Sequence, residues 1–339
     1  MTLEAASPAA KASLNKPTNL CVVVIGRNEG LRLMRCLASI VETAAPIVYV
    51  DSASTDDSAT NAASVGAHVV ALDPAKPFTA ARARNAGAAQ AAQMYPALQF
   101  IQFVDGDCVV APDWLETART FLQRNPRVAI VCGRRRECAP ERSVYNRMCD
   151  LEWDTPVGEA LACGGDALVR AKPFFAVDGF NETLTAGEEP ELCSRLRSKG
   201  WKIRRIAAEM TLHDADMDRL GQWWLRSVRG GFGYAQVWAT SRARAEPLYA
   251  RQLIRAGFWG GAVPMFALSS LYFATPAAVV ALLLPVVQVV RLAIRQGPQS
   301  RQSWEWAALT MLAKLPEFQG AVRFMISRKR RAQSAIQYK

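Results

Sequence analysis

The sequence predicts an α/β protein: an open, mainly parallel sheet with helices on both faces, followed by a hydrophobic helical segment. Short apolar runs alternate with helical patterns at the spacing of a parallel sheet. The first run, Leu20–Gly26, is continuously apolar, as in a strand buried on both faces. The hydrophobic segment is predicted by Ala256 to Val290, a run of 35 residues that contains no charge.

The expected elements alternate through the first part of the chain. In order they are strand Leu20–Gly26, helix Leu31–Val41, strand Pro46–Val50, helix Asp56–Val65, strand Ala67–Leu72, helix Phe78–Met94, strand Gln99–Val104, helix Pro112–Gln123 and strand Val128–Cys132. Pro112 suits the first position of its helix, where a missing N–H costs nothing. The regular order predicts one domain rather than a set of repeats.

Composition excludes several classes of protein. Half of the residues are apolar and 21% are charged, which rules out wholesale disorder. The eight cysteines form no C-x-x-C pair, so we expect free buried thiols instead of a zinc ribbon or a thioredoxin-like site. The chain has neither a P-loop nor a G-x-G-x-x-G motif after a strand, which argues against a P-loop nucleotide-binding protein and against a dinucleotide-binding protein. Residues 1–18 are rich in Ala, Ser and Pro, and predict a disordered lead and not a secretion signal.

Polar residues gather where the predicted strands end. They are Arg27, Asn28 and Glu29 after the first strand, Asp51 after the second, and Asp105 and Asp107 after the fourth. In open α/β sheets, ligands bind beyond the carboxyl ends of the strands. Two carboxylates separated by one glycine suit Mg²⁺ or Mn²⁺, whose remaining positions are commonly filled by substrate phosphates and water. We therefore expect a cation and phosphate site at this edge.

Four blocks in order resemble glycosyltransferase family 2: VVVIGRNEGLRLMRCLASI, IVYVDSASTDDSA, ARARNAGAAQAA and FIQFVDGDCVVAPDWL. The resemblance extends from about Leu20 to Val237. It implies a GT-A fold and an inverting transfer of sugar from a nucleoside-diphosphate sugar, with a UDP-sugar as the expected donor. The strict Q-x-x-R-W motif of processive synthases is absent, which argues against a cellulose-like polymerase.

The resemblance also implies roles for individual residues. Its donor-binding positions are Arg27, Asn28, Glu29 and Asp51 near the nucleoside, Arg84 near the base or diphosphate, and Asp105 near the ribose. Asp107 would hold the metal on the diphosphate, and His213 could touch the metal or the diphosphate or be purely structural. The block GGDALVRA, with Gly164, Gly165 and Asp166, resembles the one that backs the acceptor pocket.

The block TAGEEPELCSRLRSKGW resembles the family segment that supplies the catalytic base. The usual pair is Glu-Asp, whereas this chain has Glu188 and Glu189; position favours Glu189, with Glu188 as the second choice. Pro190 is expected to keep Glu189 out of helical geometry and to start a helix that ends before Gly200. At a helix N-terminus the dipole lowers the pKa of Glu189, while the neighbouring acids raise it.

The basic excess lies at the C-terminal end of the chain. Residues 251–339 hold twelve of the lysines and arginines against Glu305 and Glu317, within a net charge of +11. Arginines flank the apolar run on both sides, and Pro264, Pro276 and Pro285 are expected to break or kink it. The positive-inside rule then favours a hairpin or re-entrant pair at the cytoplasmic face of the membrane. A buried helical subdomain is the alternative.

The rest of the tail fits the same interpretation. Trp304 to Leu315 is patterned like an interfacial helix, and the basic cluster 328–331 suits anionic lipid headgroups. Nucleic acid is not expected as a partner, because these basic residues adjoin a long apolar run instead of an aromatic-studded sheet.

The sequence thus predicts a lead (1–18), a glycosyltransferase domain (19–240) and a membrane-association region (241–339). The expected reaction transfers sugar to a hydroxyl of a glycan or lipid-linked acceptor in cell-surface polysaccharide or glycolipid biosynthesis. Two alternatives remain: a polyprenyl-phosphate sugar synthase, and a non-catalytic membrane scaffold with a degenerate nucleotide-sugar fold.

Overall fold

The computed structural model describes residues 19–273 and 275–330, so the predicted lead lies outside the described residues. Its centre is a nine-stranded sheet in the order β3-β2-β1-β4-β8-β6-β9-β5, with β7 paired to β9. The strands are β1 (Leu20–Gly26), β2 (Ile47–Asp51), β3 (His68–Ala71), β4 (Phe100–Asp105), β5 (Cys108–Val110), β6 (Val128–Glu137), β7 (Gly158–Glu159), β8 (Ala167–Arg170) and β9 (Lys202–His213).

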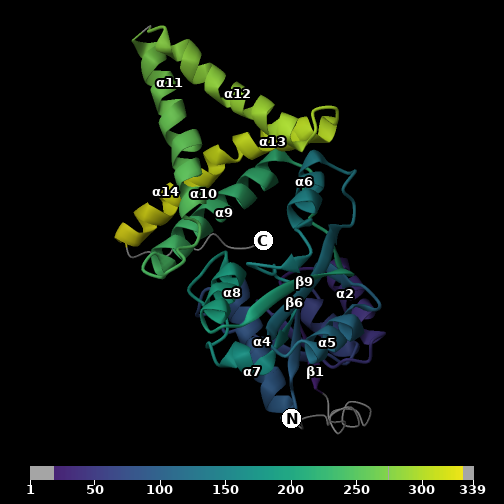
Figure 1. The fold of residues 1–339 in the computed structure, drawn as a ribbon. Helices are drawn as coiled ribbons and strands as arrows, with labels where there is room; N and C mark the ends of the chain where they lie inside the picture. Colours follow the sequence, from purple (N-terminus) through teal and green to yellow (C-terminus); the bar gives the residue numbers. More distant parts are fainter. Residues whose placement is uncertain (1–18, 274, 331–339) are drawn as a thin grey trace.

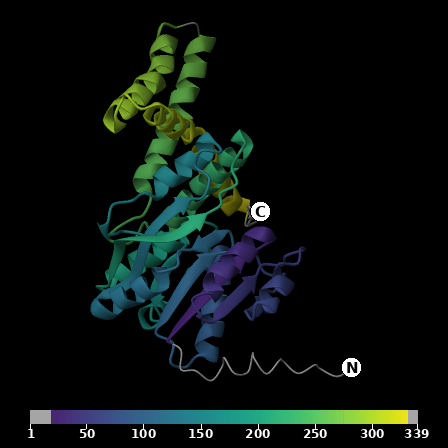
Figure 2. The same cartoon turned by 90° about the vertical axis from the view of Figure 1, so that its right-hand side faces the viewer.

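Helices surround the sheet and continue into a C-terminal helical assembly (Figures 1 and 2). They are α2 (Leu31–Val41), α3 (Ser58–Ser64), α4 (Ala80–Met94), α5 (Trp114–Arg124), α6 (Val144–Trp153), α7 (Ala171–Phe175), α8 (Glu188–Ser198), α9 (Leu220–Ser241), α10 (Ala250–Gly257), the π-helix η1 (Phe258–Ala262), α11 (Val263–Tyr272), α12 (Ala277–Gln296), α13 (Arg301–Leu312) and α14 (Lys314–Arg330).

The first half of the sheet has the predicted parallel arrangement. β1 pairs in parallel with β2 and β4, and β2 pairs in parallel with β3. Val22, Val23 and Val24 of β1 are fully buried, as expected for a strand with covered faces. Helix α4 packs very close to β1 at Gly87: a methyl group added there would lie only 2.3 Å from Val23 Cγ1. The carboxyl ends of β1, β2 and β4 therefore share one edge.

The second half of the sheet is mixed. β8 runs antiparallel to both β4 and β6, β9 runs parallel to β6, and β5 runs antiparallel to β9. β6 also extends to Glu137, five residues beyond the predicted end at Cys132. The charged run Arg134 to Glu137 does not end the strand, because β9 supplies hydrogen-bonding partners along it. Long-range pairing outweighs local polarity here.

Helices α9 and α14 lie side by side across the end of the sheet domain (Figure 1). Their backbones approach at glycines: a methyl at Gly231 would lie 1.9 Å from the carbonyl oxygen of Glu317, and one at Gly320 would lie 2.0 Å from that of Val228. Gly260 of η1 approaches the carbonyl oxygen of Lys314 just as closely. Close packing without side chains thus joins the C-terminal helix to the rest of the chain.

The long apolar run folds into a helical hairpin that projects away from the sheet (Figures 1 and 2). The first arm comprises α10, η1 and α11, and α12 returns after Pro276. Of the three prolines expected to break or kink the run, only Pro276 precedes a new helix. Pro264 lies at the start of α11, and Pro285 lies within α12, which continues past it. Among the described helices, α12 alone is long and apolar enough to cross a membrane.

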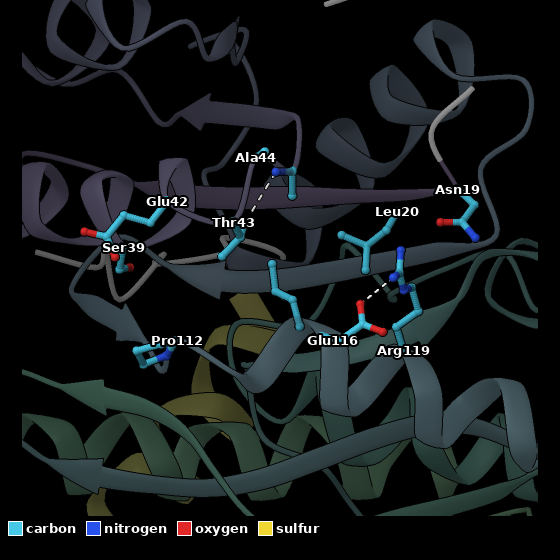
Figure 3. Close-up of a pocket in the computed structure, with 11 residues that line it drawn as sticks. Asn19, Leu20, Ser39, Glu42, Thr43, Ala44, Pro112, Glu116 and Arg119 are labelled. Carbon is cyan, nitrogen blue, oxygen red and sulfur yellow. Dashed lines mark hydrogen bonds and ion pairs between the residues drawn. The ribbon is translucent and has the colours of Figure 1, made fainter. Parts of the chain in front are cut away.

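A hollow of about 420 Å³ lies away from the predicted site (Figure 3). It is formed by the start of β1, the end of α2 and the start of α5, with Glu116 paired to Arg119 on its rim. None of the predicted donor, metal or acceptor residues lines it. Several of the predicted site residues lie instead at the carboxyl ends of β1, β2 and β4.

Candidate active site

Arg84 of α4 connects acidic residues that are far apart in sequence. Its Nη2 donates to Asp105 Oδ1 at 2.7 Å, and its Nη1 donates to Glu188 Oε1 at 2.8 Å. Glu189 Oε1 lies 3.7 Å from the same Nη1. Only 3% of the Arg84 side chain is exposed, so these charge-assisted contacts are shielded from water. The predicted donor-binding arginine and the predicted acidic pair thus meet in one place.

The two glutamates differ in their surroundings. Glu188 is buried and its carboxylate accepts from Arg84, whereas the Glu189 side chain keeps 17% of its surface exposed. Burial, reinforced by the charge of Glu188, raises the pKa of Glu189 to about 7, against the lowering effect of Arg84. Glu189 is therefore the member of the pair that can exchange a proton near neutral pH.

The predicted start of this helix is wrong by two residues. Helix α8 begins at Glu188, with Gly187 (φ +82°) as its N-cap, and Pro190 is its third residue. Glu189 therefore lies in the first helical turn, and not outside it. A proline is tolerated there because the first N–H groups of a helix have no partner within the helix. The predicted end holds: the helix stops at Ser198, and Gly200 has a positive φ.

A second cluster forms where β5 pairs with β9, which sets Cys108 opposite His213. His213 Nε2 lies 3.3 Å from Asp107 Oδ2, and His213 Nδ1 lies 3.7 Å from Glu137 Oε2. Burial alone would raise the pKa of Asp107, but the charge and hydrogen bond of His213, together with Arg135, hold it well below its usual range. Asp107 is thus an anion with an imidazole beside it.

These donors fit a divalent cation. Ligand atoms of Asp107, Cys108 and His213 all lie within 4.8 Å of one another. A carboxylate oxygen and an imidazole nitrogen are both ligands of transition-metal ions, and carboxylate also suits Mn²⁺ and Mg²⁺. Among the described residues, the buried Nδ1 of His213 makes no hydrogen bond, but it lies 3.7 Å from Glu137 Oε2, on the side where a carboxylate commonly orients a metal-binding histidine.

Arg135 of β6 occupies the space between the two clusters. Its Nη2 lies 3.4 Å from Asp105 Oδ2 and its Nε lies 3.5 Å from Asp166 Oδ2. The guanidinium stands 4.8 Å from the ring centre of Trp153, and the same ring meets His213 edge-on at 4.7 Å. Arg135 therefore balances the negative charge of the aspartates on the side away from Arg84.

The predicted acceptor block lies against the acids. A methyl at Gly165 would lie 2.6 Å from Arg84 Nη2 and 3.0 Å from Asp105 Oδ2, so the backbone passes directly over this ion pair. Gly164 has a φ of +80° and open space around it. Asp166 is fully buried: it accepts from the backbone N–H of Asp105 and from the hydroxyl of Thr211. Asp166 thus supports Asp105 through its backbone N–H and is itself shielded from solvent.

The predicted nucleoside residues form a separate loop cluster. Ser54 connects two of them, because its hydroxyl accepts from Asn28 N–H and its N–H donates to Asp51 Oδ2. Asn28 and Ala53 both have positive φ, a strain that often accompanies ligand-binding loops. Asp51 is almost fully buried. These contacts fix the shape of the loops after β1 and β2.

Arg27 and Glu29 have partners of their own, outside the contacts made by Ser54. The Arg27 guanidinium stands 5.4 Å from the Phe78 ring centre. Glu29 pairs with Arg32 at 2.7 Å. Burial, together with the negative charge of Asp107, raises the pKa of Glu29 to about 7. No contact in the described part of the chain joins Arg27 to the acids held by Arg84.

Three residues of the site were not predicted: Arg135, Glu137 and Trp153. A signal for two of them was present, since Arg135 and Glu137 follow a buried strand with the period of two that places side chains on one face. The prediction instead ended this strand at Cys132, before the charged run from Arg134 to Glu137. Trp153 lies at the end of α6, and no local pattern connects it to Arg135 or His213.

Comparisons with known proteins identify a family and a fold that this chain resembles. Residues 21–162 match the family model described as glycosyl transferase family 2. A mannosyltransferase from Pyrobaculum calidifontis, solved with GDP-Man and Mn²⁺, is similar in structure with a TM-score of 0.61 and 16% identity, over 94% of this chain and 92% of that one. Glucosyl-3-phosphoglycerate synthase from Mycobacterium tuberculosis gives a TM-score of 0.47 and 18% identity, over 68% and 81%. No curated protein sequence matches.

Proposed function

Because residues 21–162 match the model of glycosyl transferase family 2 and the chain resembles a solved glycosyltransferase in fold, we propose that the protein is an inverting, cation-dependent glycosyltransferase. Its donor is a nucleoside-diphosphate sugar, with a UDP-sugar expected. Its acceptor is a hydroxyl of a glycan or lipid-linked acceptor in cell-surface polysaccharide or glycolipid biosynthesis.

One observation carries this proposal: Arg84 binds Asp105 and Glu188 at the same time. The D-x-D aspartate and the acidic pair lie more than eighty residues apart in sequence, yet a single guanidinium spans them. A donor held by the first group would therefore present its reacting carbon to the second. A buried arginine shared between acids from two separate segments is the kind of charge network that is common at functional sites.

Glu189 accepts the acceptor's proton in the proposed reaction. As the acceptor oxygen forms its bond to the anomeric carbon, the bond from that carbon to the diphosphate oxygen breaks, and its electron pair leaves with the nucleoside diphosphate. The proton of the acceptor hydroxyl goes to the Glu189 carboxylate. No side chain forms a covalent bond with the sugar, so the anomeric configuration inverts.

Asp107 and His213 would hold Mn²⁺ or Mg²⁺, with Glu137 orienting the imidazole. When bound, the cation would supply positive charge that stabilises the diphosphate leaving group. Arg84 and Arg135 keep the remaining aspartate charge balanced in the buried site. Asn28 and Asp51 shape the loops proposed to receive the nucleoside.

We place the protein at the cytoplasmic face of a membrane through its helical hairpin. Large apolar side chains of α11 and α12 are exposed, including Leu268 at 68%, Phe266 at 54% and Val287 at 62%. An exposed apolar surface of this extent is typical of a membrane or protein interface. The basic cluster 328–331 would add attraction to anionic lipid, although its side chains lie outside the described residues.

Two substitutions test the chemistry. Asp107→Ala and Glu189→Gln should each lower kcat by about 10²-fold or more, the usual magnitude for loss of charge stabilisation or of a general base. Glu209→Gln is the control, because Glu209 pairs with Arg136 at the surface, away from both clusters. Sugar transfer by either site variant at the wild-type rate would remove its assigned role.

The acceptor needs a separate assay. Wild-type protein is incubated with a labelled nucleotide sugar and either a hydroxyl acceptor or polyprenyl phosphate alone, and the linkage formed is identified by mass spectrometry. A glycosidic bond to a hydroxyl is the expected product. A sugar phosphodiester formed with polyprenyl phosphate would instead establish the synthase alternative.

A further inference from the structure

Tyr249 lies between the acidic pair and the helical hairpin. It is the N-cap of α10, where the first arm of the hairpin begins. Its ring packs on Gly187, the residue before Glu188: a methyl at Gly187 would lie 3.3 Å from Tyr249 Cε2 and 3.6 Å from its hydroxyl oxygen. The same methyl would meet Val237 of α9 at 3.0 Å. The N-terminus of α8 is thus enclosed by α9 and by this tyrosine.

The backbone of Tyr249 is strained. Its φ is +63°, and among the described residues it is the one aromatic residue in the left-handed region. This conformation is a real outlier for a bulky side chain, and surrounding structure must enforce it. Tyr234 of α9 supplies part of that support, because the two rings pack with centroids 4.7 Å apart.

The tyrosine also feels the charge of the acids. Burial raises the pKa of the Tyr249 hydroxyl, and Tyr234, Glu189 and Glu188 add to the effect. No hydrogen bond in the described structure uses this hydroxyl to stabilise the fold, which leaves the ring as the part that makes contact with α8. The position of the ring, and not a polar contact, is therefore the feature to explain.

We infer that Tyr249 is a positioning residue whose ring fixes the first turn of α8, and with it Glu189, for proton transfer from the acceptor. This inference rests on the proposed function. This role would explain the strained backbone of Tyr249, because the positive φ directs the ring toward Gly187 while the chain turns into α10. Tyr249 also connects the start of the helical hairpin, at α10, to Glu189 through a single side chain.

The test separates the ring from the backbone and from donor binding. Tyr249→Asn keeps a residue that tolerates positive φ but removes the ring, Tyr249→Gly does the same with less strain, and Tyr249→Phe keeps the ring. Tyr95→Phe is the matched control, because Tyr95 caps α4 outside the site. Full-length proteins are compared in detergent by kcat, by KM for the donor, by calorimetric affinity for the nucleotide sugar, and by thermal unfolding.

We expect Tyr249→Asn and Tyr249→Gly to lower kcat at least tenfold, with donor affinity and donor KM changed less than twofold. Tyr249→Phe should retain at least a third of the wild-type kcat. A kcat within twofold of wild type in both ring-deleted variants would overturn the inference, as would an equal loss of donor affinity. If wild-type protein bound no nucleotide sugar at all, the proposed function itself would fall.

Discussion

At the scale of single residues, the site is decided by which acid the arginines engage. Arg84 takes the carboxylates of Asp105 and Glu188, and Arg135 stands beside Asp105 and Asp166. Glu189 lies farther from Arg84, at 3.7 Å, and burial together with the charge of Glu188 raises its pKa. The proposed roles of the two neighbouring glutamates therefore differ, with Glu188 structural and Glu189 the proton acceptor.

The raised pKa of Glu189 predicts the pH dependence of the reaction. Only the deprotonated carboxylate can accept a proton, and its pKa is about 7 in the folded protein. Activity should therefore rise as pH increases, with a midpoint near 7, and should be low below pH 6. Initial rates measured from pH 5.5 to 8.5 at saturating substrate check this. A flat profile over that range would exclude Glu189 as the base.

Glu137 offers a prediction about the cation. Replacing it with Gln removes the carboxylate that faces His213 Nδ1, so the imidazole loses its orientation. Loss of such an outer partner typically weakens metal binding by about 10- to 100-fold. Mn²⁺ affinity is read by electron paramagnetic resonance, with Glu209→Gln as the control. Unchanged Mn²⁺ affinity in Glu137→Gln would show that His213 needs no such support.

At the scale of elements, the packing of α9 against α14 depends most clearly on particular residues. Gly231 and Gly320 let the backbones of α9 and α14 come into contact, and at both positions even the methyl group of alanine would overlap a carbonyl oxygen. Gly230, the neighbour of Gly231 on the same helix, has nothing within 4 Å of an added methyl. The spacing of glycines is therefore informative only when the partner helix is known.

This pair yields a matched test of packing. Gly231→Ala should destabilise the protein by about 1–3 kcal/mol, because the methyl would overlap the carbonyl of Glu317 and force the helices apart. Gly230→Ala should be neutral or stabilising by up to ~1 kcal/mol, since alanine favours helix over glycine. Thermal unfolding of both variants in detergent measures the difference. Equal stability of the two would mean that α14 does not seat on α9 as described.

At the scale of the whole molecule, apolar surface and charge are separated. The sheet domain buries its core, whereas α11 and α12, which project away from the sheet (Figure 2), carry exposed apolar side chains. Arg251 and Arg255 precede the apolar run, and Arg291 and Arg295 follow it. The return of α14 onto α9 means that the helical region is not a detachable tail. Removal of residues 251–339 would uncover α9, so point changes are the better probe.

Val287→Arg tests membrane association. Val287 is 62% exposed on α12, and an arginine near the centre of a bilayer-inserted helix costs about 2.5–3.5 kcal/mol. The variant should bind vesicles containing anionic lipid at least tenfold more weakly than wild type in a flotation assay. Val41→Arg, an exposed valine on α2, is the control. Equal flotation of the three proteins would count against insertion of the hairpin.

Local sequence patterns were enough to predict the parallel half of the sheet. Continuous apolar runs and amphipathic helices are local patterns, so β1 and α2 were predicted with their observed bounds. The predicted polar residues lie at the carboxyl ends of the strands, although Asp51 and Asp105 are the last residues of β2 and β4 and do not follow them. The resemblance added Arg84 and the acidic pair, which the fold brings together with Asp105. The long uncharged run similarly predicted a pair of helices.

The remaining site residues depend on long-range contacts in the folded chain. Arg135 and Glu137 became site residues because β9 extended β6 through a charged segment, and Trp153 joined them from a separate helix. Asp166 turned out to support Asp105 through its backbone N–H, since Thr211 of β9 holds it. These outcomes depend on pairing between strands distant in sequence, whose energy no local window of residues contains.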